Sequence, residues 1–269
     1  MALNRLQAGR TALALAAMGA LIACGGHPAQ PTNAAAKGLA AGEADYKAPP
    51  ELTGAAAQAG GSIALVGRAA PGAAVRLASP AGAAQFASAG ADGGWRIAIP
   101  PSGAARLFSL SMSDGGQVVQ AIGYLFVTPE GLAVRLRAGG GSEAIVPRGG
   151  TTWVLTLEYD NQRAATLTGH ASPGAALSLR VDGVERGQAT VDPQGRFTLP
   201  LSQPPLPGDH EFDLAGDDAE LRFSAPIGAP APLGRAPFIA TRQGAGWRVD
   251  WLTPGGGEQT TLVLPVQAG

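Results

Sequence analysis

Residues 169–201 read GHASPGAALSLRVDGVERGQATVDPQGRFTLPL, and this stretch predicts the fold. Apolar and polar residues alternate in 177–181 and again in 197–201. An apolar residue at every second position is typical of a β-strand that is buried on one side. Between the strands, Pro173-Gly174 suits the centre of a type II turn, and Asp182-Gly183 is a strong hairpin signal. The stretch therefore predicts antiparallel strands joined by tight turns.

The same pattern occurs earlier in the chain. Residues 63–77 (IALVGRAAPGAAVRL) match residues 165–179 (ATLTGHASPGAALSL) at a shift of 102 positions without a gap. The shift also carries Trp95 onto Phe197. A repeat of this length indicates a duplicated domain rather than a short solenoid unit. The first copy lacks an Asp-Gly pair in 78–90, which leaves its strand pairing open there.

Two further features extend the repeat toward the ends of each copy. Residues 131–141 (GLAVRLRAGGG) resemble 246–257 (GWRVDWLTPGGG) with one position inserted, and both predict a late strand followed by a Gly-rich turn. Residues 151–159 (TTWVLTLEY) are rich in β-branched and aromatic residues and predict the strand that opens the second copy. Residues 148–150 before it would link the two domains.

The second copy resembles bacterial immunoglobulin-like modules of surface and envelope proteins. The match covers Gly169 to Leu201: a Gly-x-Ala-x-Pro-Gly opening, an Asp-Gly hairpin, an Asp-x-x-Gly turn and an aromatic strand. The resemblance implies an all-β chain with two tandem immunoglobulin-like antiparallel β-sandwiches, over residues 61–147 and 148–269. It specifies a fold and no activity, because such modules serve as spacers, adhesin stalks and binding domains.

The N-terminus has the marks of an export signal. Residues 1–23 begin with positive charges and continue into an apolar run that is too short to span a bilayer. Leu21-Ile22-Ala23-Cys24 resembles the lipobox of bacterial lipoproteins, and Cys24 is the only cysteine in the chain. The resemblance implies that Cys24 is lipidated and anchors the chain in a membrane. The alternative is an ordinary secretory signal with an incidental thiol at Cys24.

The segment after the anchor predicts a flexible tether. Residues 24–60 are poor in aromatic and branched apolar side chains, so they bury too little surface to offset the entropy of ordering. Gly25 stands where an Asp commonly retains such lipoproteins in the inner membrane, which favours the outer membrane. The net charge of −1 gives no electrostatic footprint for nucleic acid.

No catalytic or cofactor motif occurs in the sequence. Nucleophile elbows, zinc-binding spacings and a phosphate-binding loop are all absent. His27 lies in the tether, and His170 and His210 have no matched partner nearby in the sequence. We therefore expect a protein that is not an enzyme and that needs no cofactor.

Two clusters are weaker candidates for binding. The acidic stretch 209–220 offers the calcium-type ligands Asp209, Glu211, Asp213, Asp217 and Asp218, although their spacing matches no calcium loop. A solvated strand face is the more ordinary interpretation. Trp247 and Trp251 share one face of the strand GWRVDW. They would either fill a core that is short of large side chains or form an exposed platform for sugars or a partner.

The sequence leaves three functions open. The first is a non-enzymatic envelope lipoprotein that acts as a spacer or interaction module, with another envelope protein as its partner. The second is an envelope carbohydrate-binding protein that uses Trp247 or Trp251. The third is a hydrolase with an unrecognised site around His170 or the acidic stretch.

Overall fold

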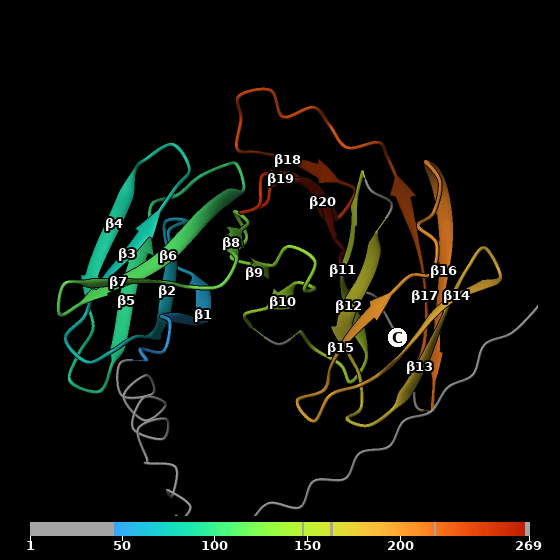
Figure 1. The fold of residues 1–269 in the computed structure, drawn as a ribbon, viewed down its shortest axis with the longest axis horizontal. Helices are drawn as coiled ribbons and strands as arrows, with labels where there is room; N and C mark the ends of the chain where they lie inside the picture. Colours follow the sequence, from blue (N-terminus) through green and yellow to red (C-terminus); the bar gives the residue numbers. More distant parts are fainter. Residues whose placement is uncertain (1–45, 147, 162–163, 218, 267–269) are drawn as a thin grey trace, which may run out of the picture. The chain divides into compact units, whose positions relative to one another are not determined.

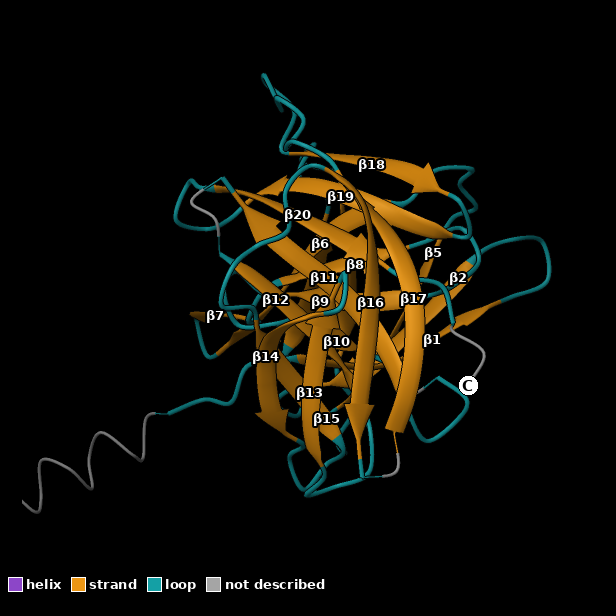
Figure 2. Cartoon of the chain, turned by 90° about the vertical axis from the view of Figure 1, so that its right-hand side faces the viewer, coloured by secondary structure: helices purple, strands orange, loops and turns teal. Residues whose placement is uncertain are grey.

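The computed structural model describes residues 46–146, 148–161, 164–217 and 219–266, which form strands and connecting loops without a helix (Figure 2). The chain from Lys47 onward is one compact unit. The described residues contain no helix that is long and apolar enough to cross a membrane. The expected signal peptide, Cys24 and most of the expected tether lie outside the described residues.

The first half is a sandwich of two antiparallel sheets (Figure 1). One sheet has the order β1-β2-β5, and the other has the order β10-β9-β8-β6-β3-β4 with β7 paired to β6. The strands are β1 (Glu51–Ala57), β2 (Ile63–Arg68), β3 (Ala74–Ala78), β4 (Ala84–Ser88), β5 (Gly94–Ile99), β6 (Arg106–Asp114), β7 (Gln117–Gln120), β8 (Tyr124–Val127), β9 (Ala133–Leu136) and β10 (Glu143–Ala144).

The second half repeats the arrangement. Its sheets have the orders β15-β12-β11-β20-β19-β18 and β14-β13-β16-β17. The strands are β11 (Trp153–Asp160), β12 (Ala165–His170), β13 (Ala176–Val181), β14 (Val184–Thr190), β15 (Arg196–Pro200), β16 (Gly208–Gly216), β17 (Ala219–Ile227), β18 (Phe238–Gln243), β19 (Gly246–Leu252) and β20 (Glu258–Val263).

The strand order identifies both halves as immunoglobulin-like sandwiches. In each half the first, second and fifth strands share one sheet, and the third, fourth and sixth strands belong to the other. This Greek-key order is that of the immunoglobulin-like fold. The prediction of an all-β chain with two tandem immunoglobulin-like sandwiches is confirmed.

The duplication reaches further back than the sequence pattern indicated. β1 pairs with β2 in the register that β11 has with β12, each position shifted by 102, and both pairs have an irregularity at the same place, between Leu52 and Gly54 and between Val154 and Thr156. Residues 51–57 were expected to belong to the tether, and that expectation is wrong. The ladder to β2 and the burial of Leu52 order this Ala-rich strand despite its weak alternation.

Matching glycines in the two copies allow aromatic rings to pack against the backbone. A Cβ on Gly67 would collide with the Glu51 carbonyl oxygen and the ring of Trp95. A Cβ on Gly169 would collide with the Trp153 carbonyl oxygen and come within 2.7 Å of the ring of Phe197. Both copies therefore keep a close contact between a glycine and an aromatic side chain on the neighbouring strand.

The predicted turns are present. Asp182 (φ 51°) and Gly183 (φ 77°) join β13 to β14 with positive φ at both positions, as a type I′ hairpin turn requires. Without an Asp-Gly pair, β3 and β4 still pair antiparallel. In that turn the Ser79 N–H donates to the Ala83 carbonyl at 2.8 Å, and Gly82 has a φ of 90°.

Each sandwich continues into a three-stranded meander, and the two meanders join different sheets. β8-β9-β10 extends the sheet of the first half from β6, whereas β18-β19-β20 extends the sheet of the second half from β11. β9 and β19 are the middle strands, and each is followed by a Gly-rich turn, as the match between 131–141 and 246–257 predicted.

Three hydrophobic cores stabilise this arrangement. One fills each sandwich, and a third joins residues of the two halves. The third core contains, from the first half, Ala105, Leu107, Phe126, Val134 and Leu136, and from the second half Trp153, Leu155, Trp247, Val249, Trp251 and Val263. The outward faces of the two extended sheets are therefore buried against each other.

Candidate functional site

Trp247 and Trp251 lie in the third core. Alternation along β19 puts both indoles on the face that meets the first half, where Trp251 is 0% exposed and Trp247 is 9% exposed. Tyr124 meets Trp251 edge to face, and Phe126 meets Trp247 in the same manner, with ring centroids 6.1 Å apart. The prediction that these tryptophans fill a core is confirmed.

An exposed indole platform for sugars is absent from the described chain. Trp95 and Trp153 are also buried. The guanidinium of Arg242 lies 5.2 Å from the centroid of Trp247 and forms an ion pair with Glu130 of the first half, so it covers the ring that is nearest to solvent. The alternative prediction, that Trp247 and Trp251 form an exposed platform for sugars, is therefore wrong. The first half covers the face of β19 on which a sugar would have to stack.

A buried carboxyl group lies at the junction of the halves. Glu158 of β11 is 3% exposed, and burial raises its pKa. Its Oε1 accepts hydrogen bonds from the Ser142 N–H at 2.8 Å and the Thr156 hydroxyl at 3.2 Å, and its Oε2 accepts one from Gln259 Nε2 at 3.1 Å. Sequence reasoning missed this residue, although an acidic residue in the apolar strand TTWVLTLEY was a visible signal.

A charged cluster lies beside Glu158. Glu143 of β10 contacts Arg135 at 3.1 Å, Arg137 at 3.2 Å and Arg196 of the second half at 3.0 Å. A cavity of about 370 Å³ adjoins this cluster and is lined by residues of both halves. Arg196 also pairs with Asp192, and through Glu143 the cluster forms an ion-pair contact between the two halves.

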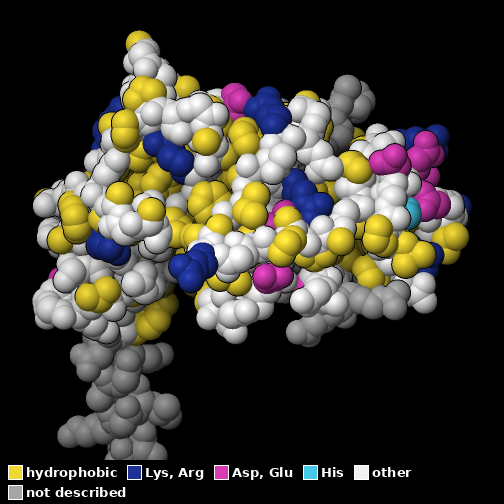
Figure 3. Space-filling view, turned by 90° about the horizontal axis from the view of Figure 1, so that it is seen from above, with side chains coloured by type: hydrophobic (Ala, Val, Ile, Leu, Met, Phe, Trp, Pro, Cys, Tyr) yellow, Lys and Arg dark blue, Asp and Glu magenta, His cyan; other side chains and the backbone are white. Residues whose placement is uncertain are grey.

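A groove of about 680 Å³ lies between the halves on another side. Its lining has no charged side chain and includes Tyr124 and Gln120 from the first half and Leu252 and Pro254 from the second. Figure 3 shows the molecule from above, with apolar side chains spread over this face and basic and acidic side chains among them. The lining of the groove has no His, Cys, Asp, Glu, Lys or Arg side chain, and its hydroxyl groups are those of Ser109, Tyr124 and Thr253.

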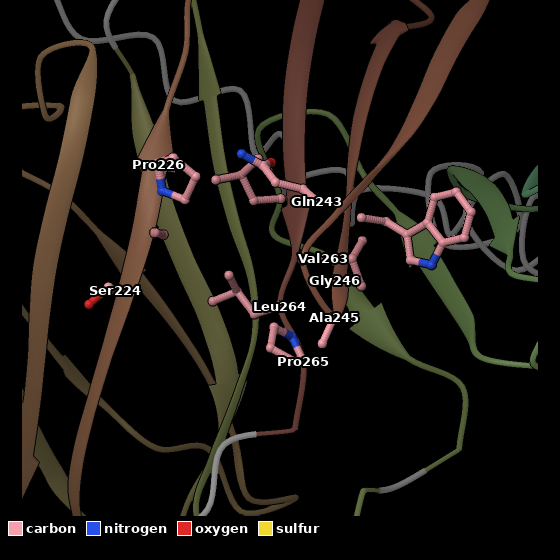
Figure 4. Close-up of a pocket in the computed structure, with 12 residues that line it drawn as sticks. Ser224, Pro226, Gln243, Ala245, Gly246, Val263, Leu264 and Pro265 are labelled. Atoms are coloured by element: carbon pink, nitrogen blue, oxygen red, sulfur yellow. The ribbon is translucent and has the colours of Figure 1, made fainter.

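A smaller pocket of about 300 Å³ opens at one end of the second sandwich (Figure 4). Pro226 of β17 lies on one side, and Gln243, Gly246 and Val263 lie on the other. The lining is mainly apolar, and it holds no titratable side chain.

The acidic stretch forms a strand face and no metal cage. Asp209, Glu211 and Asp213 point to the same side of β16, and Asp213 pairs with Arg222 across the hairpin. Asp217 lies in the turn, and Asp218 lies outside the described residues. Within the described ranges, no group of three or more His, Cys, Asp or Glu side chains is placed to hold a metal ion.

The two described histidines hold backbone segments in place. His170 stacks on Trp153 with ring centroids 5.4 Å apart, and its Nδ1 lies 3.1 Å from the Thr151 carbonyl oxygen. His210 Nδ1 lies 2.6 Å from an Asp182 carboxylate oxygen, and its Nε2 lies 2.6 Å from the Leu206 carbonyl oxygen. The contacts of both rings fit structural roles. Cys24, the expected lipidation site, lies outside the described residues.

Comparisons with known proteins identify no family. No family model matches the chain, and no curated protein matches it. The solved structures that are similar include the BSP domain of a biofilm-associated protein, at 12% identity and a TM-score of 0.23, which covers 68% of this chain and 30% of that chain. They also include the central fibronectin-III array of RIM-binding protein, at 15% identity and a TM-score of 0.25, which covers 79% of this chain and 75% of that chain.

A third similar structure is invasin, a bacterial integrin-binding protein, at 14% identity and a TM-score of 0.20. This match covers 80% of the present chain and 54% of invasin. Superpositions with such scores carry no argument about function. The fold assignment rests on the strand order of the two sandwiches.

Proposed function

We propose that this protein is a non-enzymatic lipoprotein of the bacterial cell envelope whose two fused sandwiches act as a stiff interaction module or spacer. The motif Leu21-Ile22-Ala23-Cys24 supports the anchor. The third core supports the stiffness, and it is the observation on which the proposal chiefly depends.

The third core distinguishes this protein from a flexible string of domains. Interfaces between domains of one chain are usually modest and polar, so relative motion is the ordinary expectation. Here Phe126 and Val134 of the first half and Trp251 of the second are 0% exposed at the junction. Bending at the link would expose these side chains to water, at about 25 cal/mol per Å² of apolar surface. The two halves would therefore move together.

The link itself is also held in place. The Arg148 guanidinium donates to the Leu264 carbonyl oxygen at 2.8 Å and lies 5.9 Å from the centroid of Trp153. Burial lowers the pKa of Arg148 to about 10. The half-buried guanidinium of Arg148 therefore ties the link to Leu264, which follows the last strand of the second half.

The proposed location is the outer membrane, because Gly25 follows the lipidated residue. The proposed partner is another envelope protein, bound through sheet edges that remain unpaired. The membrane is a partner through the acyl chains on Cys24, and nucleic acid is not.

Cys24→Ser is the variant that tests the anchor. The unchanged chain should stay with the membranes after washing in high salt, and mass spectrometry should find acyl chains on Cys24. The Cys24→Ser chain should appear in the soluble fraction with its sandwiches folded. An unmodified Cys24 thiol on protein released from cells would contradict the proposal. Gly25→Asp is the matched variant, which should move the anchored protein to the inner membrane.

The stiffness has its own test. Small-angle X-ray scattering on the soluble Cys24→Ser chain should fit one rigid body for the two sandwiches. Scattering that requires an ensemble of bent arrangements would contradict the spacer function while leaving the anchor intact.

A further inference from the structure

The repeat reveals an unfilled position at the edge of β1. β11 is the counterpart of β1 at the shift of 102, and it lies between β12 and β20. β1 pairs with β2 on one side, and no other strand of the described chain pairs with it. The second half therefore shows which kind of strand the first half lacks.

The equivalent ladder identifies the backbone groups that face the open edge. The Leu264 N–H donates to the Leu155 carbonyl oxygen at 2.9 Å, and Leu157 lies opposite Leu262 in the same register. The shift of 102 carries Leu155 onto Thr53 and Leu157 onto Ala55. In an antiparallel ladder, alternate residues direct both backbone groups to the same neighbour. The backbone groups of Thr53 and Ala55 therefore point away from β2.

The open stretch runs from Thr53 to Ala56. The loop at Gly131 approaches the end of the strand, where a Cβ on Gly131 would come within 3.2 Å of the Ala57 nitrogen. Gln58 Nε2 donates to the Ala57 carbonyl oxygen at 3.2 Å. Within the open stretch, Thr53 and Ala56 are exposed, and Gly54 and Ala55 are half-buried.

The edge of β1 lacks the usual protection against pairing. Natural edge strands are protected by charged side chains, by proline or by covering segments. β14 carries Glu185 and Arg186, β17 carries Arg222 and Pro226, and β18 carries Arg242. β1 has its single charge at its first residue, and glycine and alanines follow from position 54.

We propose that the edge of β1 binds an extended strand from a partner protein, antiparallel, in the place that β20 takes on β11. The proposal rests on the proposed function as an interaction module and names the surface that would be used. Main-chain hydrogen bonds would supply affinity, and alternate side chains would supply specificity.

The chemistry of the partner strand follows from β20 and from the small residues of β1. Ala55 packs against the core of the first sandwich, so the side chain opposite it should be apolar, as Leu262 is opposite Leu157. β1 has Ala55 where β11 has Leu157, so β1 presents a smaller apolar side chain to an incoming strand at this position. The partner is an extended segment that is uncharged where it pairs with residues 53–56 and that places an apolar side chain opposite Ala55.

A peptide with the sequence of residues 258–265 (EQTTLVLP) is the probe, and the soluble Cys24→Ser chain is the receptor. Binding should slow amide hydrogen exchange at Ala55 and should give a saturable change in fluorescence anisotropy of the labelled peptide. N-methylation at Leu262, whose N–H would face β1, should weaken binding about tenfold or more, because one bond is lost and its acceptor is left unpaired.

The matched control is the same peptide N-methylated at Thr261. In β20 this residue pairs with Val249 of β19, on the side away from β11, so its methylation should change the affinity less than about twofold. Equal losses for both methylated peptides would overturn the proposal, since side-chain contact rather than a ladder would then hold the peptide.

Two further results would overturn the edge proposal. One is an unchanged exchange rate at Ala55 with the peptide in excess. The other is a dimer, seen in sedimentation, that disappears in an Ala55→Pro variant, which would show that a second copy fills the edge. Neither result bears on the anchor, because Cys24→Ser fractionation tests the anchor separately.

Discussion

Trp251 of the second sandwich and Tyr124 of the first meet edge to face, with ring centroids 5.8 Å apart and ring planes inclined at 83°. Trp251 Nε1 donates to the Thr261 hydroxyl at 3.1 Å, so its single polar atom is satisfied while the ring is buried. Such aromatic pairs contribute about 0.5–1.5 kcal/mol beyond the burial of their area. The contact links a side chain of the first sandwich to a buried side chain of the second.

Removing this indole should destabilise the whole unit. Trp251→Ala should lower the free energy of unfolding by about 3–5 kcal/mol, because a large cavity is left between the sandwiches. Urea denaturation followed by circular dichroism measures the change. Phe86→Ala is the matched control, since Phe86 is 68% exposed, and it should change stability by less than about 0.5 kcal/mol. A loss below about 1 kcal/mol for Trp251→Ala would refute the shared core.

The close packing at Gly169, the counterpart of Gly67, leads to a second prediction. Gly169→Ala should lower the free energy of unfolding by more than about 2 kcal/mol, because its Cβ meets a backbone carbonyl oxygen that cannot move aside. Gly149→Ala is the matched control, because nothing lies within 4 Å of its Cβ position. Thermal melts of the two variants compare them directly. Equal melting temperatures would show that the close approach at Gly169 is absent.

Local patterns predicted the elements that local chemistry controls. Asp182-Gly183 specifies a hairpin by its backbone preferences, and the alternation in 177–181 specifies a one-sided strand. These signals lie within a few residues of the structure that they determine. The structure shows that the two copies share the register of their first two strands, as expected of a duplicated sequence.

Features that depend on distant partners were not predictable in this manner. The sequence put Trp247 and Trp251 on one strand face but did not show that the first half covers that face. β1 has little side-chain signal, because its order comes from pairing with β2. Glu158 needs donors from Ser142 and Gln259, which are far from it in the sequence.

Glu158 predicts a dependence of stability on pH. Burial raises its pKa above the ordinary value of 4.5, so above about pH 4.5 the folded state binds more protons than the unfolded state, until the raised pKa is passed. Stability from this group is therefore present at low pH and is lost as pH rises through the folded pKa. Glu158→Gln removes the titration, so its stability relative to the unchanged chain should increase from pH 5 upward.

The measurement is urea denaturation of both chains at several pH values between 4 and 8. The side-chain amide introduced by Glu158→Gln retains an oxygen for the Ser142 N–H, and the amide of Gln259 can turn to present its own oxygen. Glu158→Ala removes the acceptor altogether and should cost about 1–3 kcal/mol for the unpaired buried donor. If the free energies of unfolding of the unchanged chain and of Glu158→Gln changed with pH in parallel, the raised pKa of Glu158 would be contradicted.

The contacts of His210 in β16 predict a second dependence of stability on pH. Burial alone would lower its pKa, but hydrogen bonds to Asp182 and to the Leu206 carbonyl outweigh burial and raise the pKa above 6.5. The imidazolium form can donate from both ring nitrogens. The stability that it contributes is present in full below about pH 6.5 and is lost as pH rises through the raised pKa.

The Asp182 carboxylate sets the lower limit of the pH range in which its contact with His210 stabilises the fold. The hydrogen bond from His210, followed by the one from the Glu211 N–H, lowers the pKa of Asp182. Its contribution is present above the ordinary value of 3.8 and is lost as pH falls through the depressed pKa. The contact between the two side chains should therefore be strongest in mildly acidic solution.

NMR titration of the His210 ring protons in the soluble chain measures this effect. The midpoint should lie above 6.5 in the unchanged chain and should fall in Asp182→Asn, because asparagine tolerates the positive φ at this position but carries no charge. The melting temperature of the unchanged chain should exceed that of His210→Gln at about pH 6, and the difference should shrink by about pH 8. A midpoint at or below 6.5 in the unchanged chain would refute the contact with Asp182, and an unaltered midpoint in Asp182→Asn would assign the shift to the Leu206 carbonyl instead.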